Sequence, residues 1–174
     1  EVNSIIWPNP VFDNNITVFG PQVKSLAGRY LNQMIEDIQQ LPDPDGVAAS
    51  LLDSIDLIVP HQANKTMVMQ LADKAGLSAD RLYFNIERVG NASSASIPLA
   101  IHDAVRDGVI TKPVRIFAPG FGAGAVAGYT VLRLDPAVVD VQSPHPSAVA
   151  QADPAQAPAT GQSSASDDVQ AAFG

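Results

Sequence analysis

The feature that most constrains this chain is the alternation of short apolar runs with longer segments of helical periodicity. The run from Asp56 to Pro60 is entirely apolar between its ends. Comparable β-type runs occur at 2–7, 16–19, 82–86, 114–118 and 129–134. Apolar residues recur at helical spacing over 23–38, 47–52, 63–75 and 93–105. Continuous apolar strands alternating with helices are typical of an α/β sheet covered on both faces.

The end of this pattern predicts how the last two strands pair. Only a glycine-rich loop at 120–124 separates the run at 114–118 from the run at 129–134. Such a short connection joins antiparallel neighbours, whereas parallel strands need a long crossover. We therefore expect an α/β fold with a mixed, mostly parallel five-stranded sheet and helices on both faces.

Composition divides the chain into two unequal parts. Residues 136–174 are rich in Ala, Pro, Ser and Gln, and they include four Asp but neither Lys nor Arg. Such a segment cannot bury enough apolar surface to offset its ordering entropy. We expect a folded domain over residues 1–135 and a flexible acidic tail over residues 136–174.

Charge and cysteine content exclude several classes of function. The net charge of −8 argues against nucleic-acid binding, and the chain has no cysteine for a disulfide, a thiolate metal site or a nucleophile. No apolar run is long enough to span a membrane. The first residues show no signal-type pattern, so we expect a cytoplasmic location.

Three polar segments follow predicted strands, and they occupy residues 59–64, 89–96 and 119–124. Because sites in open α/β sheets form beyond the carboxyl ends of strands, these loops are expected to meet. They would bring together the imidazole of His61, the carboxamide of Asn91 and several backbone N–H groups. These groups could polarise a carbonyl and hold an oxyanion. The serines of the second loop do not sit in a nucleophile-elbow pattern.

Taken together, the three motifs resemble those of one enzyme family. The string DLIVPHQAN at 56–64, then GNASSASIP at 90–98 and FGAG at 121–124, resembles β-ketoacyl-acyl-carrier-protein synthase III. The resemblance covers residues 16 to 134 and concerns the C-terminal half of that family. It implies a thiolase-like fold of two similar halves, with the active-site cysteine in the N-terminal half. It also implies that this chain is one half of such an enzyme.

The resemblance implies catalytic roles for His61 and Asn91. In the family, the equivalent side chains donate hydrogen bonds to the thioester carbonyl of the malonyl donor and stabilise the enolate formed on decarboxylation. The backbone N–H of Ala123 would contribute to a second oxyanion hole, where the family usually has glycine. No metal or bound cofactor is implied.

Contacts with a carrier protein or coenzyme A would involve Gln62, Asn64 and Lys65. The family commonly has arginine at the position of Thr66. From the residues alone, the favoured interpretation of Gln62 and Asn64 is that they cap the helix that follows and brace the loop.

The implied partners are an N-terminal half, acyl carrier protein, acyl-coenzyme A and a second copy of the enzyme in a homodimer. The small apolar residues of 92–104 resemble the central helix that packs between the two halves. Two alternatives stay open: a non-catalytic thiolase-fold half that braces a heteromeric partner, and an unrelated small-ligand-binding α/β domain.

Overall fold

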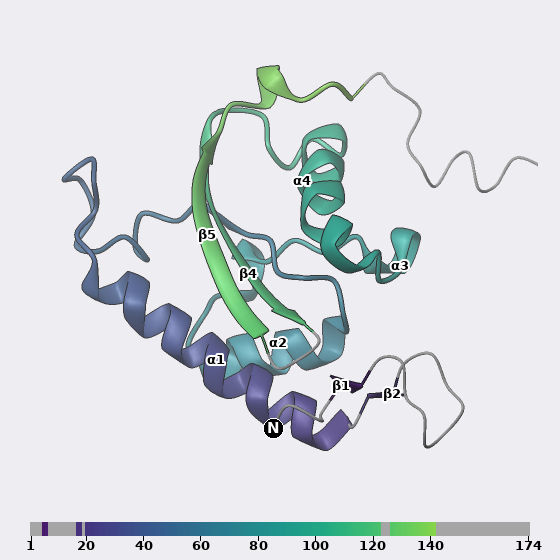
Figure 1. Cartoon of the computed structure of the whole chain (residues 1–174). Helices are drawn as coiled ribbons and strands as arrows, with labels where there is room; N and C mark the ends of the chain where they lie inside the picture. The colour runs from purple at the N-terminus through teal and green to yellow at the C-terminus, as the bar shows by residue number, and fades with distance from the viewer. Residues whose placement is uncertain (1–4, 7–16, 19, 123–125, 142–174) are drawn as a thin grey trace, which may run out of the picture. The chain divides into compact units, whose positions relative to one another are not determined.

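A three-stranded sheet forms the centre of the structure, a computed structural model that describes residues 5–6, 17–18, 20–122 and 126–141 (Figure 1). Its strands are β3 (Leu57–Ile58), β4 (Val114–Gly122) and β5 (Val126–Leu134), in that order. β3 and β4 are parallel, while β4 and β5 are antiparallel along their whole length. The predicted antiparallel pairing of the last two strands is confirmed.

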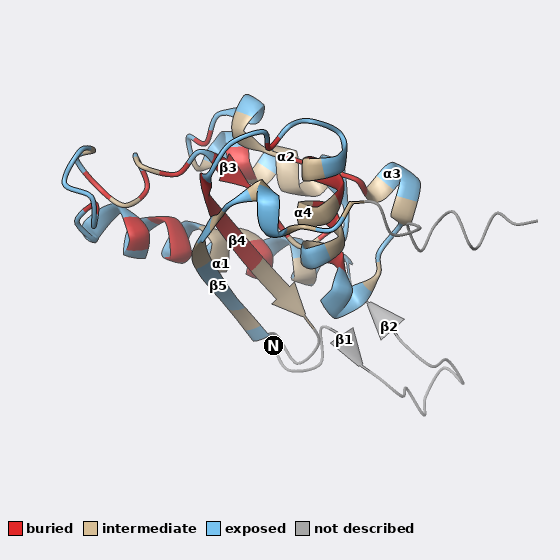
Figure 2. Cartoon of the chain, turned by 90° about the horizontal axis from the view of Figure 1, so that it is seen from above, coloured by how far each residue is buried: buried red, intermediate tan, exposed pale blue. Residues whose placement is uncertain are grey.

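The sheet separates two apolar cores, and alternate residues of its strands join each. Figure 2 shows that most of β4 is buried, whereas β5 is more exposed. Ile58 and Phe117 join one core, whereas their neighbours Leu57 and Ile116 join the other. The register explains this, because Leu57 pairs with Ile116 and Ile58 with Phe117. Side chains of successive strand residues leave opposite faces, so the apolar run buries both faces of the sheet.

Helices cover both faces, as the sequence predicted (Figure 1). They are α1 (Gly20–Gln40), α2 (Lys65–Lys74), α3 (Ile86–Val89) and α4 (Ser96–Arg106). One core receives α1 and α2, and the other receives α4. The helices predicted at 23–38, 63–75 and 93–105 are confirmed. Single 3₁₀ turns occur at η2 (Ala79–Arg81), η3 (Ser93–Ala95) and η5 (Pro136–Val138).

The predicted five-stranded sheet is wrong in its number of strands. Two early strands, β1 (Ile5–Ile6) and β2 (Thr17–Val18), pair with each other in a separate two-stranded sheet. The run at 82–86 is not a strand, because only Leu82 bridges to Ile58 before α3 begins at Ile86. The sheet beside the three loops therefore has three strands.

The helix predicted at 47–52 is also wrong, since these residues form bends and turns. The carboxylate of Asp43 provides the reason. It accepts hydrogen bonds from the backbone N–H groups of Val47 and Ala48, both at 2.9 Å. A side chain that satisfies these donors offers the backbone an alternative to helical hydrogen bonds.

Helices α1 and α2 come close together at Gly28. A Cβ atom added to Gly28 would lie 2.9 Å from Cδ2 of Leu71 on α2. This separation is too short for a real contact, so the absence of a side chain at Gly28 permits the present packing of Leu71.

Most of the predicted tail lies outside the described residues. At its start, Pro136–Val138 forms one 3₁₀ turn capped by the side chain of Asp135, and residues 142–174 are not described. The flexibility of the tail therefore stays a prediction. Within the described part of the chain, no helix combines the length and apolar character needed to cross a membrane.

Candidate functional site

His61 lies at the carboxyl end of β3, where parallel pairing with β4 continues beyond the strand itself. The backbone N–H of Val59 donates to the carbonyl of Phe117, and that of His61 donates to the carbonyl of Pro119, each at 2.9 Å. The pairing thus extends by two further hydrogen bonds, as far as His61. It fixes the backbone of His61 beside the end of β4, as expected for a site at the strand ends.

The ring of His61 is half-buried, and one of its nitrogens forms a hydrogen bond with a serine. Its Nδ1 lies 2.6 Å from Oγ of Ser96, the first residue of α4. Burial lowers the pKa of His61 below its ordinary value. A histidine with a lowered pKa is neutral at pH 7, so this ring can act as an uncharged hydrogen-bond donor or acceptor.

Asn91 is positioned by a tightly constrained loop. Gly90 has φ 72° and ψ −164°, a backbone conformation that is essentially restricted to glycine. Oδ1 of Asn91 then accepts the backbone N–H of Ser93 at 2.9 Å, and Ser93 itself has a positive φ of 53°. Nδ2 of Asn91 has no hydrogen-bond partner among the residues that the structure describes. The loop therefore holds the acceptor end of the amide and leaves its donor end available.

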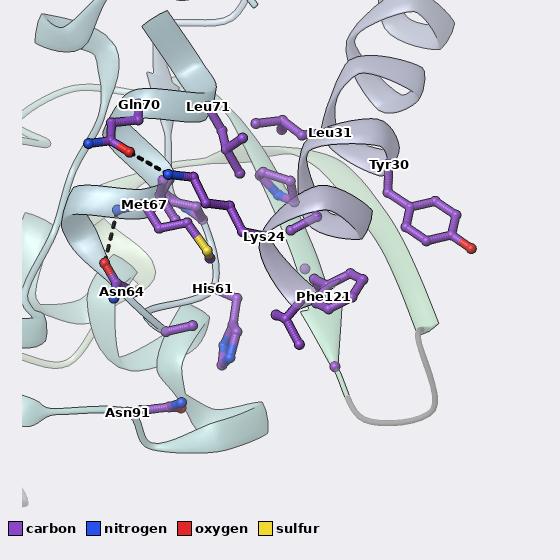
Figure 3. Close-up of a pocket in the computed structure, with 18 of the residues that line it drawn as sticks. Lys24, Tyr30, Leu31, His61, Asn64, Met67, Gln70, Leu71, Asn91 and Phe121 are labelled. Atoms are coloured by element: carbon purple, nitrogen blue, oxygen red, sulfur yellow. Dashed lines mark hydrogen bonds between the residues drawn. The ribbon is translucent and has the colours of Figure 1, made fainter. Parts of the chain in front are cut away.

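His61 and Asn91 line the same pocket, whose volume is about 850 Å³ (Figure 3). They reach it from two separate loops, so the expected meeting of these loops takes place. The end of β4 from Pro119 to Gly122 contributes the third side. The volume lies within the range usual for small-molecule sites.

The wall opposite the loops comes from helices that sequence reasoning did not connect with the site. The helical residues on this wall are Gly20, Val23, Lys24, Ala27, Tyr30, Leu31 and Met34 of α1, and Thr66, Met67, Val68, Gln70 and Leu71 of α2. Most are apolar. Nζ of Lys24 donates to Oε1 of Gln70 at 2.8 Å, which links the two helices (Figure 3).

The structure places the three expected carrier or coenzyme A contacts differently. Gln62 is 1% exposed, and its amide bonds to the carbonyl of Pro60 and the N–H of Asn85. Its side chain braces the loop, in line with the bracing interpretation, and its contact with a carrier or coenzyme A stays a prediction. Asn64 caps α2 by accepting the N–H of Met67 at 2.9 Å, and it remains exposed.

Lys65 is also exposed. Its Nζ forms an exposed ion pair with Glu87 at 2.6 Å and lies 5.7 Å from the ring centre of Phe84. Ala123, expected to supply an oxyanion-hole N–H, lies outside the described residues.

A buried polar network behind the site was missed at the sequence level. Asp103 of α4 is fully buried and accepts hydrogen bonds from Nδ2 of Asn85 at 2.9 Å and from Arg88 at 3.2 Å. Arg88 belongs to α3, which leads directly into Gly90 and Asn91. The network therefore ties the loop that carries Asn91 to α4, while Asn85 also joins it to Gln62.

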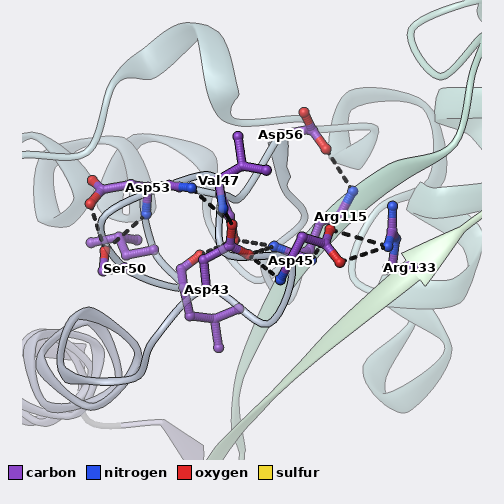
Figure 4. Close-up of polar contacts among 12 residues, drawn as sticks. Asp43, Asp45, Val47, Ser50, Asp53, Asp56, Arg115 and Arg133 are labelled. Atoms are coloured by element: carbon purple, nitrogen blue, oxygen red, sulfur yellow. Dashed lines mark hydrogen bonds and ion pairs between the residues drawn. The ribbon is translucent and has the colours of Figure 1, made fainter.

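A second charged cluster lies around Arg115, and none of its members lines the pocket (Figure 4). The guanidinium of Arg115 pairs with Asp43 at 2.7 Å and with Asp45 at 2.8 Å. Arg133 on β5 also reaches Asp45, at 3.2 Å. These pairs attach the loop after α1 to β4 and β5, which is a structural role. Among the described residues, no group of three His, Asp or Glu side chains could hold a metal ion.

The fold defines the class of this chain: it is a thiolase-like α/β domain. Residues 48–134 match the family described as 3-oxoacyl-[acyl-carrier-protein] synthase III, C terminal. The chain belongs to this family.

Relatives in sequence agree with this assignment. The chain is 36% identical over 120 residues to β-ketoacyl-[acyl-carrier-protein] synthase III of Clostridium acetobutylicum, covering 69% of this chain and 35% of that protein. It is 38% identical over 117 residues to the synthase III of Sphingopyxis alaskensis, covering 67% of this chain and 33% of the relative. The chain therefore spans about a third of the length of these relatives.

Solved structures show the same fold. The 3-oxoacyl-(acyl carrier protein) synthase III of Pseudomonas aeruginosa PAO1 matches with a TM-score of 0.65 and 29% identity, over 78% of this chain and 41% of that one. The synthase III of Aquifex aeolicus VF5 matches with a TM-score of 0.61 and 25% identity, over 75% and 40% of the two chains.

Proposed function

We propose that this chain is the enolate-stabilising half of a decarboxylating Claisen condensing enzyme of the 3-oxoacyl-acyl-carrier-protein synthase III type. The observation that carries the proposal is the shared pocket of His61 and Asn91. In His61, Nδ1 contacts Ser96 and Nε2 is available; in Asn91, Oδ1 accepts the N–H of Ser93 and Nδ2 is available.

Two neutral donors suit the chemistry of this reaction. In the proposed step, the bond between the α-carbon of a malonyl thioester and its carboxylate breaks, and carbon dioxide leaves. The electron pair is delocalised onto the thioester oxygen, which accepts hydrogen bonds from His61 and Asn91. Donors already aimed at the position where charge develops lower the barrier without reorganisation.

The second step requires a partner for the enolate. We propose that an acyl primer is held as a thioester on a cysteine supplied by an N-terminal half, since this chain contains no cysteine. The enolate carbon attacks the thioester carbonyl, a carbon–carbon bond forms, and the cysteine leaves as thiolate. The reaction conserves electrons, so no redox cofactor is needed.

The apolar walls of the pocket support a thioester substrate. The side chains of α1 and α2 that line the pocket are largely hydrophobic. The pocket volume of about 850 Å³ is enough for the thioester-bearing arm of a carrier protein or of coenzyme A. Lys65 and Asn64 remain proposed contacts for the donor outside the pocket. A homodimer, the absence of a cofactor and a cytoplasmic location also stay predictions.

The test uses His61→Ala and Asn91→Ala in the complete enzyme, with release of carbon dioxide from malonyl thioester as one assay and acylation of the cysteine as the other. Each substitution should reduce decarboxylation by about 10²- to 10³-fold, the usual effect of removing one such donor. Cysteine acylation should stay largely intact, because it does not use these donors.

His102→Asn provides the control, since His102 is the other described histidine and does not line the pocket. It should retain decarboxylation. Unchanged decarboxylation in both pocket variants would refute the proposal and favour a non-catalytic half that braces a partner.

A further inference from the structure

The contact between His61 and Ser96 indicates which nitrogen of the imidazole ring carries the proton. Ser96 is 2% exposed, and its Oγ lies 2.6 Å from Nδ1 of His61. The same oxygen faces a second group, the backbone N–H of Gln62, at 3.4 Å. A backbone N–H can only donate, so one lone pair of the serine oxygen is directed to Gln62.

The proton of the Ser96 hydroxyl needs an acceptor because the group is buried. Among the described residues, Nδ1 of His61 is the only hydrogen-bond partner of Oγ of Ser96 that could accept it. If Nδ1 carried a proton instead, the serine proton would be left unpaired in a buried position, which is costly. The network therefore favours a hydroxyl that donates and an unprotonated Nδ1.

The surroundings of the ring favour a neutral imidazole. The other titratable side chains that line the pocket are Lys24 and Tyr30, and no Asp or Glu among the described residues lines it. A carboxylate at Nδ1 would stabilise the imidazolium, whereas a hydroxyl does not. If the ring is neutral and Nδ1 is an acceptor, the one proton bound to a ring nitrogen is on Nε2.

We propose that Ser96 is a positioning residue that fixes His61 in the Nε2–H tautomer, so that the ring presents a neutral donor to the pocket. Its use in stabilising an enolate rests on the proposed function. The tautomer itself does not, because it follows from the contacts of Ser96. The serine at the first position of α4 thus sets the direction of the hydrogen bond that His61 offers.

Nitrogen NMR of the full chain labelled with ¹⁵N-histidine tests the assignment directly. In the unsubstituted protein, Nδ1 of His61 should show the shift of an unprotonated ring nitrogen and Nε2 that of a protonated one, at a pH above the pKa of His61. The His61→Ala variant identifies the signals. A protonated Nδ1 would overturn the proposal whatever the enzymatic activity. This result is obtained on the unsubstituted protein, so it does not depend on whether any Ser96 variant folds.

Ser96→Ala should populate both tautomers, and Ser96→Thr, which keeps a hydroxyl, should restore the single Nε2–H form. In the complete enzyme, Ser96→Ala should lower kcat for decarboxylation by about tenfold, the scale of one hydrogen bond, with little change in KM. Ser78→Ala removes an exposed hydroxyl that donates to Asp80 and does not line the pocket, and it serves as the control.

The two proposals fail differently. If Ser96→Ala keeps the pure Nε2–H form, Ser96 does not set the tautomer and the inference is wrong. If the tautomer responds as expected but neither Ser96→Ala nor His61→Ala alters decarboxylation, the positioning role stands and the proposed function falls.

Discussion

Replacement of Gly90 by alanine is the most informative perturbation of the site, because its two consequences can be separated. Gly90 has φ 72° and ψ −164°, and a Cβ atom added there would meet nothing within 4 Å. The substitution therefore creates no clash, and its whole cost is backbone strain. Residues held in such a region lose about 1–3 kcal/mol.

The chain can respond to Gly90→Ala in two ways. If the loop keeps its conformation, the protein loses about 1–3 kcal/mol of stability, which corresponds to a fall in Tm of about 2–12 °C for a domain of this size. If the loop relaxes instead, stability is largely kept but Asn91 moves. Since a displacement of about 1 Å can reduce a rate by about 10²-fold, decarboxylation should then fall strongly.

Gly108→Ala is the matched control. Gly108 also has a φ of 72° and open space around its missing Cβ, but it lies after α4 and does not line the pocket. Its substitution should cost about 1–2 kcal/mol and leave decarboxylation unchanged. The assays are thermal unfolding and carbon dioxide release. A Gly90→Ala variant with normal Tm and normal decarboxylation would refute the reasoning.

Three other predictions concern stability. The N–H of Ala48 and the guanidinium of Arg115 hold the pKa of Asp43 below its usual range, so the stability from this carboxylate is present above about pH 4 and is lost as pH falls further. In urea unfolding, the free energy of unfolding should therefore differ less between pH 7 and pH 3 in Asp43→Asn than in the unsubstituted chain. Equal differences in the two proteins would contradict this. Phe117→Ala removes a fully buried ring and should cost about 3–5 kcal/mol in denaturant unfolding, so a loss below about 1 kcal/mol would contradict its place in the core. Asn64→Ala should cost about 1 kcal/mol and Asn64→Asp much less, because aspartate also caps α2; equal losses would show that the cap contributes nothing.

The sequence was sufficient for those features that depend on local periodicity. The apolar residues of 56–60 predicted a strand buried on both faces, and Ile58 and Leu57 do enter different cores. The spacing of motifs after strands predicted that His61 and Asn91 would reach one pocket, which they do. Their catalytic roles stay predictions, because no measurement of activity bears on them.

Features that depend on distant pairs could not be predicted in the same way. Asp43 and Arg115 are separated by 72 positions, and no local pattern connects them. The same carboxylate of Asp43 also binds the N–H groups of Val47 and Ala48, and these local bonds account for the absence of a helix at 47–52. The run at 82–86 has the composition of a strand, but Asn85 bonds to buried Asp103 and the chain turns into α3.

For Ser96, the sequence indicated the segment but not the contact that the residue makes. The sequence places it within the segment that also contains Asn91, yet only the structure shows that it touches the ring of His61. Helix α1 contributes much of the pocket wall although no motif marks it.

The close contact of Gly28 with Leu71 suggests how the capacity of the site could change without alteration of any residue that lines it. Gly28 is not part of the wall, whereas Leu71 is. A larger residue at 28 would have to displace the Leu71 side chain, whose Cδ2 lies only 2.9 Å from the new Cβ atom. A substitution at position 28 could thus change the shape of the pocket from behind its wall, while His61 and Asn91 stay unaltered.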